Sequence, residues 1–220
     1  MLNNSFKTIM RRRITFIFCA LLLPILFFGQ VFKEISDPSE LIESYISHSE
    51  NISSIKADFD QEKHTEFLEK PLLTKGLFYS DSEKRFRWEQ NGAQPYVMII
   101  NDQDAFIFKN GAWETHDLER DRHLRYISEL IASIINGQIL RSEEYEMTFY
   151  GSELQYKVEL VPKKERMKKY MSMVTLVLRR SDWLLDGLTI EDGSGNRTVL
   201  TFHDQISNAE LASSLFSPDN

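Results

Sequence analysis

Two stretches of the chain carry hydrophobic residues at helical spacing. The first begins with the start signal Asp37-Pro38-Ser39-Glu40 and continues with Leu41, Ile42, Tyr45 and Ile46. The second has a broader apolar stripe and ends at Asn136-Gly137, a typical helix end; its stripe consists of Leu124, Ile127, Leu130, Ile131, Ile134 and Ile135. The pattern therefore predicts amphipathic helices at 37–52 and 121–136.

Most of the remaining chain after residue 52 has the pattern of antiparallel strands. Ile55, Ala57 and Phe59 alternate with polar residues, and Asn-Gly pairs at 91–92 and 110–111 mark tight turns. Strands are expected near 52–59, 72–79, 86–89, 96–100, 106–108, 113, 145–150, 154–161, 173–179, 184–191 and 197–203. This order predicts an α+β fold, an incomplete (half) antiparallel β-barrel of about 10–11 strands covered by a lid of α-helices.

The N-terminus has the anatomy of a secretory signal peptide. Lys7 and Arg11-Arg12-Arg13 precede an apolar run from Ile14 to Phe28, which Gly29 ends abruptly. The run is shorter than the roughly 20 apolar residues of a spanning helix, and a proline interrupts it. We expect residues 1–29 to be a signal peptide cleaved near Gly29, and residues 30–220 to be one exported domain in the periplasm.

Composition then removes several classes of function. The only cysteine, Cys19, lies within the apolar run, so the exported chain would have no disulfide, thiolate metal site or cysteine nucleophile. Without Lys7 and the three arginines, 22 of the 26 basic residues remain against 33 acidic ones. That excess of negative charge argues against nucleic acid as a partner and against a protein that lies flat on anionic lipid.

One long stretch resembles a known family. Residues 52–88 combine a strand, a second strand opening at Gly76, a tight turn and Phe86-Arg87-Trp88, and the segment 206–218 ends in Leu215-Phe216 and a proline. In order and spacing, these features resemble the outer-membrane lipoprotein carrier proteins (LolA-like) from about Ser39 to Pro218. The resemblance implies a periplasmic carrier that shields lipoprotein acyl chains in a hydrophobic cavity and delivers them from the inner to the outer membrane.

The resemblance also implies where the acyl chains bind. Helices at 37–52 and 121–136 would cover the open barrel, although they could instead complete a dry core. The inward-facing candidates for acyl-chain binding are Phe78, Phe86, Trp88, Tyr96, Met98, Ile100, Phe106 and Phe108 from strands, with Leu124, Ile127, Ile131 and Ile134 from the lid. Aromatic and methionine side chains suit a promiscuous apolar pocket, and they are equally ordinary core residues.

One departure from the family pattern concerns how the lid is fastened. In known carriers, a basic residue followed by proline precedes the Phe-x-Trp strand and helps to hold the lid, whereas here the turn reads Ser82-Glu83. Lys84 and Arg85 are one or two positions away, and a shift of one residue reverses the face of a strand. We do not transfer the latch role to either residue.

Enzymatic chemistry has little support. The five histidines form no HExxH motif, Ser152 lacks a GxSxG context, and the glycines at 193 and 195 fit a hairpin turn. The cluster from His116 to His123 resembles the polar lead-in of a helix more than a metal site. We expect no catalytic residue, no cofactor and no bound metal.

The partners follow from the resemblance and from one basic loop. Lys163, Lys164, Lys168 and Lys169 stand out against the negative total and could dock an acidic membrane-bound partner, although solvated lysine-rich loops are common. The resemblance implies a monomer that receives cargo from an inner-membrane ABC-type lipoprotein release complex, and it leaves an outer-membrane receptor open. The alternatives are a periplasmic protein-binding or sensor module of the same fold, and a divergent carrier of another amphiphilic lipid.

Overall fold

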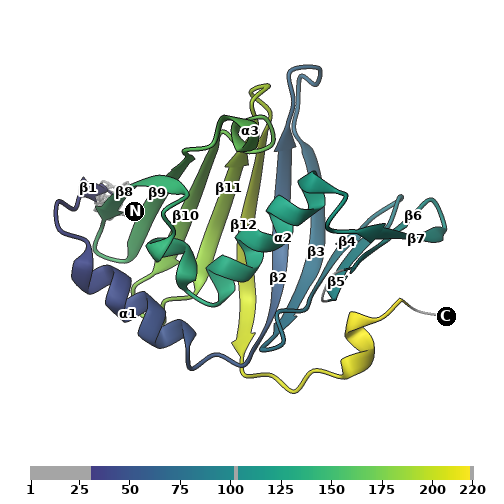
Figure 1. Cartoon of the computed structure of the whole chain (residues 1–220), viewed down its shortest axis with the longest axis horizontal. Coiled ribbons are helices and arrows are strands. Elements are labelled where there is room, and N and C mark those ends of the chain that lie inside the picture. The colour runs from purple at the N-terminus through teal and green to yellow at the C-terminus, as the bar shows by residue number, and fades with distance from the viewer. Residues whose placement is uncertain (1–30, 102–103, 219–220) are drawn as a thin grey trace, which may run out of the picture.

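Twelve antiparallel strands form one open sheet in the computed structural model, which describes residues 31–101 and 104–218 (Figure 1). Their order is β1-β8-β9-β10-β11-β12-β2-β3-β4-β5-β6-β7, so β1 and β7 are the edges and the sheet does not close into a barrel. The strands are β1 (Lys33–Glu34), β2 (Ser54–His64), β3 (Leu72–Asp81), β4 (Phe86–Asn91), β5 (Tyr96–Asn101), β6 (Asp104–Lys109), β7 (Ala112–Asp117), β8 (Tyr145–Gly151), β9 (Gln155–Pro162), β10 (Met173–Arg179), β11 (Leu185–Glu191) and β12 (Arg197–Ser207).

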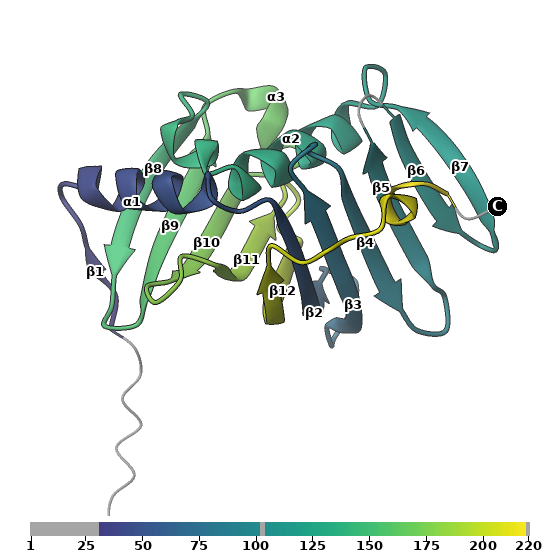
Figure 2. The same cartoon turned by 90° about the horizontal axis from the view of Figure 1, so that it is seen from below.

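The helices lie on one side of this sheet. The two long ones are α1 (Ser39–Ser49) and α2 (Arg122–Ile135), and both cross the same face in Figures 1 and 2. The short ones are α3 (Glu165–Lys168) and the 3-10 turns η1 (Gln138–Arg141) and η2 (Ser213–Phe216). None of the described helices has the length and hydropathy needed to span a membrane.

The predicted fold class is confirmed: an α+β protein with an open antiparallel sheet under a helical cover. Of the twelve strands, the sequence pattern missed the two-residue β1, which pairs with β8, and it treated the short helix α3 as part of a basic loop. Both predicted helices are one or more residues shorter than expected at each end, and Asp121 caps α2 by accepting a hydrogen bond from the backbone N–H of Leu124 at 3.1 Å. The predicted signal peptide and its cleavage site lie outside the described residues.

Strand register decides which side chains face the helices. Phe59 lies opposite Gly76, Phe78 opposite Trp88, and Trp88 in turn opposite Met98. Because directly opposed residues share a face, these side chains all point toward α1 and α2. The main hydrophobic core is therefore sandwiched between this face of the sheet and the helices.

The C-terminal segment covers part of the opposite face. It leaves β12 at Asn208, whose side-chain oxygen accepts a hydrogen bond from the backbone N–H of Ser53 at 2.7 Å, and then runs beneath β2, β3 and β4 (Figure 2). Arg87 donates to the carbonyl of Leu215 at 3.2 Å, and Phe216 is buried close to the equally buried Ile99 of β5. The segment thus shields a second, smaller apolar area on the back of β4 and β5.

Candidate functional site

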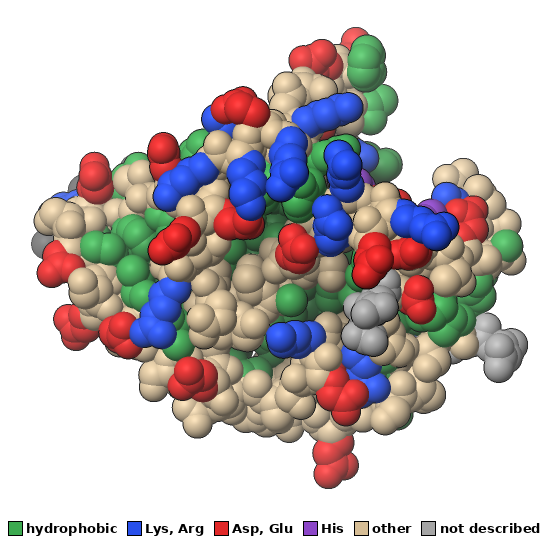
Figure 3. Space-filling view, viewed as in Figure 1, with side chains coloured by type: hydrophobic (Ala, Val, Ile, Leu, Met, Phe, Trp, Pro, Cys, Tyr) green, Lys and Arg blue, Asp and Glu red, His purple; other side chains and the backbone are tan. Residues whose placement is uncertain are grey.

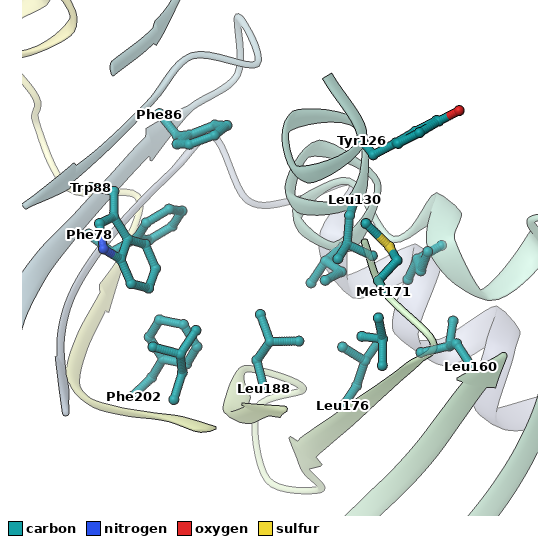
Figure 4. Packing of buried hydrophobic residues seen from close by; sticks show 14 of the residues in the cluster. Phe78, Phe86, Trp88, Tyr126, Leu130, Leu160, Met171, Leu176, Leu188 and Phe202 are labelled. Carbon is teal, nitrogen blue, oxygen red and sulfur yellow. The ribbon is translucent and has the colours of Figure 1, made fainter. Parts of the chain in front are cut away.

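A partly open cavity of about 540 Å³ lies between α2 and the sheet. Its volume is within the range of about 300–1,000 Å³ that is typical of small-molecule sites. Figure 4 shows Phe78, Trp88 and Phe202 grouped on one side, with Leu130 of α2 and Leu176 of β10 on the other. The apolar lining includes Ile55, Phe78, Trp88, Tyr96, Met98, Leu188, Ile190, Leu200 and Phe202 from the sheet and Ile127, Ile131, Ile134 and Ile135 from α2.

The sheet side of the cavity is built around an aromatic cluster. Trp88 stacks on Phe59 with ring centres 4.0 Å apart, and Phe78 meets Trp88 edge to face at 6.0 Å. Phe202 contacts Phe78 in the same way at 6.3 Å. Such rings give the wall a large and rigid apolar surface.

The helix side is less well packed. Ile127, Ile131 and Ile135 line the cavity, and all three are only partly buried although they contact the core. Because each is already largely buried, complete coverage by a ligand or a tighter packing would contribute up to about 1 kcal/mol per side chain. The lid therefore leaves apolar surface exposed to the cavity.

A hydrogen bond joins the two helices of the lid. The hydroxyl of Tyr45 in α1 donates to the carbonyl of Ile134 in α2 at 2.7 Å, and burial raises the pKa of this tyrosine well above its usual value. Gly137 follows α2 with a φ of 73°, and a Cβ there would lie 3.0 Å from Ser49 and 3.1 Å from the backbone of Ile46. Glycine thus allows the end of α2 to approach α1 closely.

One end of the cavity is polar. Gln90 donates to Gln61 at 3.0 Å and Gln61 donates to Thr74 at 3.1 Å, forming a ladder across β4, β2 and β3. Lys63 and Asp192 also line this end. Burial opposes ionisation of Asp192, but hydrogen bonds from the side chain of Asn196 and from nearby backbone N–H groups outweigh it, so its pKa lies below the usual value. An amphiphile would find apolar walls along α2 and polar partners here.

The structure brings seven of the twelve predicted acyl-binding residues into the lining of this cavity. These are Phe78, Trp88, Tyr96, Met98, Ile127, Ile131 and Ile134. Phe86, Ile100 and Leu124 belong to the buried core and are not in contact with the cavity. Their role in binding stays a prediction.

Phe106 and Phe108 require a correction, because they lie on the other face of the sheet. Met98 of β5 is opposite Ile107, whereas Phe106 is opposite Ile99. Ile107 therefore faces the helices, and Phe108 instead contacts Trp113 of the edge strand β7 with ring centres 5.4 Å apart. The prediction placed β6 one residue out of phase.

Sequence reasoning also missed cavity residues in the second half of the sheet. Leu188 and Ile190 of β11 and Leu200 and Phe202 of β12 line the cavity from the side opposite β4. All four sit at alternate positions of strands that were expected. Extending the inward-face assignment beyond residue 108 would have found them.

The two candidate latch residues do not reach the lid. Lys84 sits in the turn with a φ of 63°, and Arg85 points to the opposite face, where it pairs with Asp81 at 2.5 Å and lies 4.8 Å from the ring centre of Phe216. The hydrogen bond to Asp81 raises the pKa of Arg85, although burial acts against its charge. Arg85 therefore holds the C-terminal segment, and within the described chain the Tyr45 hydrogen bond links α1 to α2.

The predicted docking lysines lie on and around α3. Lys164 pairs with Glu144, and Lys168 pairs with Glu165 at 2.6 Å. Among the described residues, no ion pair of Lys163 or Lys169 is found. Two of the four positive charges thus have acidic neighbours. Their role in docking a partner stays a prediction.

Metal ligands are sparse near the cavity. His116 lies 3.6 Å from Asp121, whose carboxylate already caps α2, as expected for a helix lead-in. Among the described residues, one trio of possible ligands is close enough to share an ion, namely Asp58, His203 and Asp204. Asp58 is on the face away from the cavity and Asp204 is exposed, so we assign no metal to this trio.

Comparison with known proteins shows which family and which known structures the chain resembles. The family model described as outer membrane lipoprotein carrier protein LolA matches residues 50–219, and no curated protein matches the sequence. An uncharacterized conserved protein from Thermus thermophilus matches with a TM-score of 0.50 and 8% identity, covering 84% of this chain and 95% of that chain. A LolA superfamily protein from Nitrosomonas europaea matches with a TM-score of 0.42 and 12% identity, covering 80% and 97%. At such identities the structural similarity concerns the fold alone.

Proposed function

Since the chain belongs to the LolA family of outer membrane lipoprotein carrier proteins, we propose that it is a periplasmic carrier that shields lipoprotein acyl chains in its cavity and delivers them from the inner to the outer membrane. The observation that carries this proposal is the apolar cavity under α2, where Ile127, Ile131 and Ile135 remain partly uncovered opposite the aromatic wall. A flexible acyl chain would complete the burial of these isoleucines. The transfer involves no covalent chemistry.

The position of the cavity bears on how the cargo enters. The cavity lies between α2 and the sheet, so the space for acyl chains depends on how far α2 stands from the sheet. Movement of α2 away from the sheet would enlarge that space for a bulky cargo.

Energetics favour the same mechanism. Complete burial of about 40 methylenes would yield roughly 30 kcal/mol, above the practical limit of about 20 kcal/mol for non-covalent binding. A carrier that bound its cargo so tightly could not release it. Partial burial under a displaceable α2 allows a relay from the release complex in the inner membrane to an acceptor, driven by differences in apolar contact.

The proposal extends to the chain as a whole. Residues 30–220 act as one carrier domain, exported by the signal peptide at 1–29 and working as a monomer. Lys163, Lys164, Lys168 and Lys169 dock an acidic membrane-bound donor or acceptor partner. Acyl-chain binding involves the seven cavity residues above, with Phe86, Ile100 and Leu124 supporting them from the core.

A fluorescence titration tests the function. The exported protein is titrated with an acyl-chain probe, and the probe is then displaced with a triacylated lipopeptide or with the same peptide without acyl chains. We expect only the lipidated form to displace the probe. Ile131→Ser should weaken probe binding about tenfold, because a polar group would face the acyl chain, whereas the same change at the exposed Leu154 should leave binding unchanged.

The other outcomes separate the alternatives. Displacement by a free amphiphile but not by the lipopeptide would indicate a carrier of another lipid. No probe binding at all would refute the carrier function and favour a protein-binding or sensor module of the same fold.

A further inference from the structure

The hairpin between β2 and β3 exposes an unusual amount of apolar surface. Phe67 is 91% exposed, Leu68 53%, Leu72 54% and Leu73 67%. These are four of the eight large hydrophobic side chains that are exposed in the described chain, and they fall within seven consecutive positions. Contiguous exposed apolar patches on a water-soluble protein commonly mark an interaction surface.

The hairpin projects beyond the rest of the sheet at the end where α3 lies (Figure 1). A turn at residues 192–195 bridges the two, because the N–H of Gly193 donates to the carbonyl of Lys169 at 3.3 Å and Gly195 lies close to Glu66 of the hairpin. The apolar tip and α3 therefore belong to one continuous end of the molecule.

The α3 side of this end is basic, in contrast to the chain as a whole, whereas the hairpin itself has Glu62, Glu66 and Glu69 against Lys63 and Lys70. Residues 163–169 contain five basic residues and one acidic residue, although the formal charge of the whole chain is −7. Figure 3 shows Lys and Arg side chains gathered beside the projecting hairpin. Basic side chains next to exposed Phe and Leu form the usual combination of a peripheral site for an anionic membrane.

The same hairpin reaches the cavity. Lys63 and Leu72 line the polar end of the cavity, and Leu72 is also one of the four exposed apolar residues. Leu72 is thus the residue that the exposed apolar group shares with the cavity lining. A contact at the tip would bring that opening to whatever surface the tip enters.

We propose that the β2–β3 hairpin inserts Phe67 and Leu68 into the headgroup region of an anionic lipid bilayer, with the basic residues of 163–169 binding the lipid phosphates. A second copy of the chain is a poorer occupant, because a symmetrical contact at this end would bring two basic α3 regions together. The contact is end-on, and although Glu66 and Glu69 flank the inserted pair, the five basic residues of 163–169 outnumber them. Bilayer binding is measured without cargo, so it does not rest on the proposed carrier function.

Site-specific labelling tests insertion directly. The only cysteine, Cys19, lies in the predicted signal peptide, so Phe67→Cys in the exported protein accepts a single environment-sensitive fluorophore. Leu154→Cys is the matched control, since Leu154 is 67% exposed in the turn between β8 and β9, at the other end of the strands. With vesicles of phosphatidylethanolamine and phosphatidylglycerol, the label at 67 should shift to the blue and the label at 154 should not.

Flotation with the same vesicles gives the second measurement. The double variant Phe67→Ser, Leu68→Ser should lower the partition coefficient about tenfold or more, and Leu154→Ser should leave it unchanged. Reversing Lys163 and Lys169 to Glu should abolish the preference for vesicles that contain phosphatidylglycerol over vesicles without it. All these variants should still bind the acyl-chain probe in solution, which separates this inference from the carrier function.

Three results would overturn the proposal. The first is a label at 67 that stays unchanged with anionic vesicles. The second is a blue shift that appears without vesicles as protein concentration rises, which would indicate self-association. The third is equal flotation of the serine double variant and the unchanged protein.

Discussion

Gly76 shows how one residue shapes the cavity wall. It lies opposite Phe59, and a Cβ at this position would come 2.3 Å from the Phe59 ring and 1.9 Å from the carbonyl oxygen of Glu89. Without a side chain, Gly76 lets Phe59 lie across β3 and stack on Trp88. The aromatic wall therefore depends on the smallest residue in β3.

We expect Gly76→Ala to lower the free energy of unfolding by about 2–3 kcal/mol, because the methyl group must push both the ring and the backbone aside. Urea unfolding would measure the loss. Gly187→Ala is the control, since a Cβ there would have its nearest neighbour at 3.5 Å, an ordinary contact. If Gly76→Ala lowered the free energy of unfolding no more than Gly187→Ala, the aromatic wall would be able to rearrange around the added methyl group.

At the scale of elements, α2 matters most because it covers the cavity and is joined to α1. The Tyr45 hydrogen bond to the carbonyl of Ile134 ties the last turn of α2 to α1, and the pair Arg141–Glu43, at 2.6 Å, ties η1 to α1 on the surface. The buried bond contributes more than the exposed ion pair, which water and salt screen. The C-terminal end of the lid is thus its anchored end.

Tyr45→Phe should loosen that anchored end. Loss of a buried hydrogen bond that leaves a carbonyl without its partner should cost about 1–3 kcal/mol, and amide hydrogen exchange in residues 130–136 should accelerate. Tyr126→Phe on the same lid is the control, because no hydrogen bond of the Tyr126 hydroxyl is found among the described residues. Unchanged exchange in Tyr45→Phe would mean that packing alone holds the lid.

The elements were predictable from the sequence more fully than the faces of the strands. Alternation identified eleven strands, and helical spacing identified α1 and α2, because each pattern reflects a burial period. In β6, however, Ala105, Phe106, Ile107 and Phe108 are all apolar, so alternation cannot distinguish the faces. Register in this hairpin is set by the pairing of Asn101 with Asp104, and the small Ala105, not an aromatic ring, fits opposite Ile100.

The lid contacts were less predictable still. The bond from Tyr45 joins residues 89 positions apart, and the pattern of hydrophobic residues gives no information about such a pair. The polar ladder of Gln61, Thr74 and Gln90 likewise becomes visible only when three strands are in register. Local periodicity predicts elements, whereas the site arises from long-range pairing.

For the molecule as a whole, buried tyrosines reduce the stability of the folded state at high pH. Burial, reinforced by nearby Glu144 and Glu129, raises the pKa of Tyr145 to about 12, and burial raises that of Tyr45 as well. Above about pH 10 the unfolded chain releases these protons first, so the unfolded state gains relative stability. The folded state therefore loses stability as the pH rises from about 10 to 12.

Urea unfolding at pH 9 and pH 11 would measure this effect. A shift of about two units in one tyrosine corresponds to at most roughly 3 kcal/mol above pH 12, and to about half of that between pH 9 and pH 11. Tyr145→Phe should reduce the loss between the two pH values, because phenylalanine does not titrate. An identical loss in the variant would assign the effect to other groups.

The C-terminal segment on the back of β4 and β5 is the last part of the structure that can form during synthesis. Residues 213–216 are synthesised after every strand, yet they cover Ile99 and hold the carbonyls that Arg87 and Asn101 bind. A chain interrupted before Leu215 would have all twelve strands and still present an uncovered apolar surface. A quality-control protease that recognises exposed hydrophobic surface could thus distinguish an unfinished chain from a finished one by the back of its sheet.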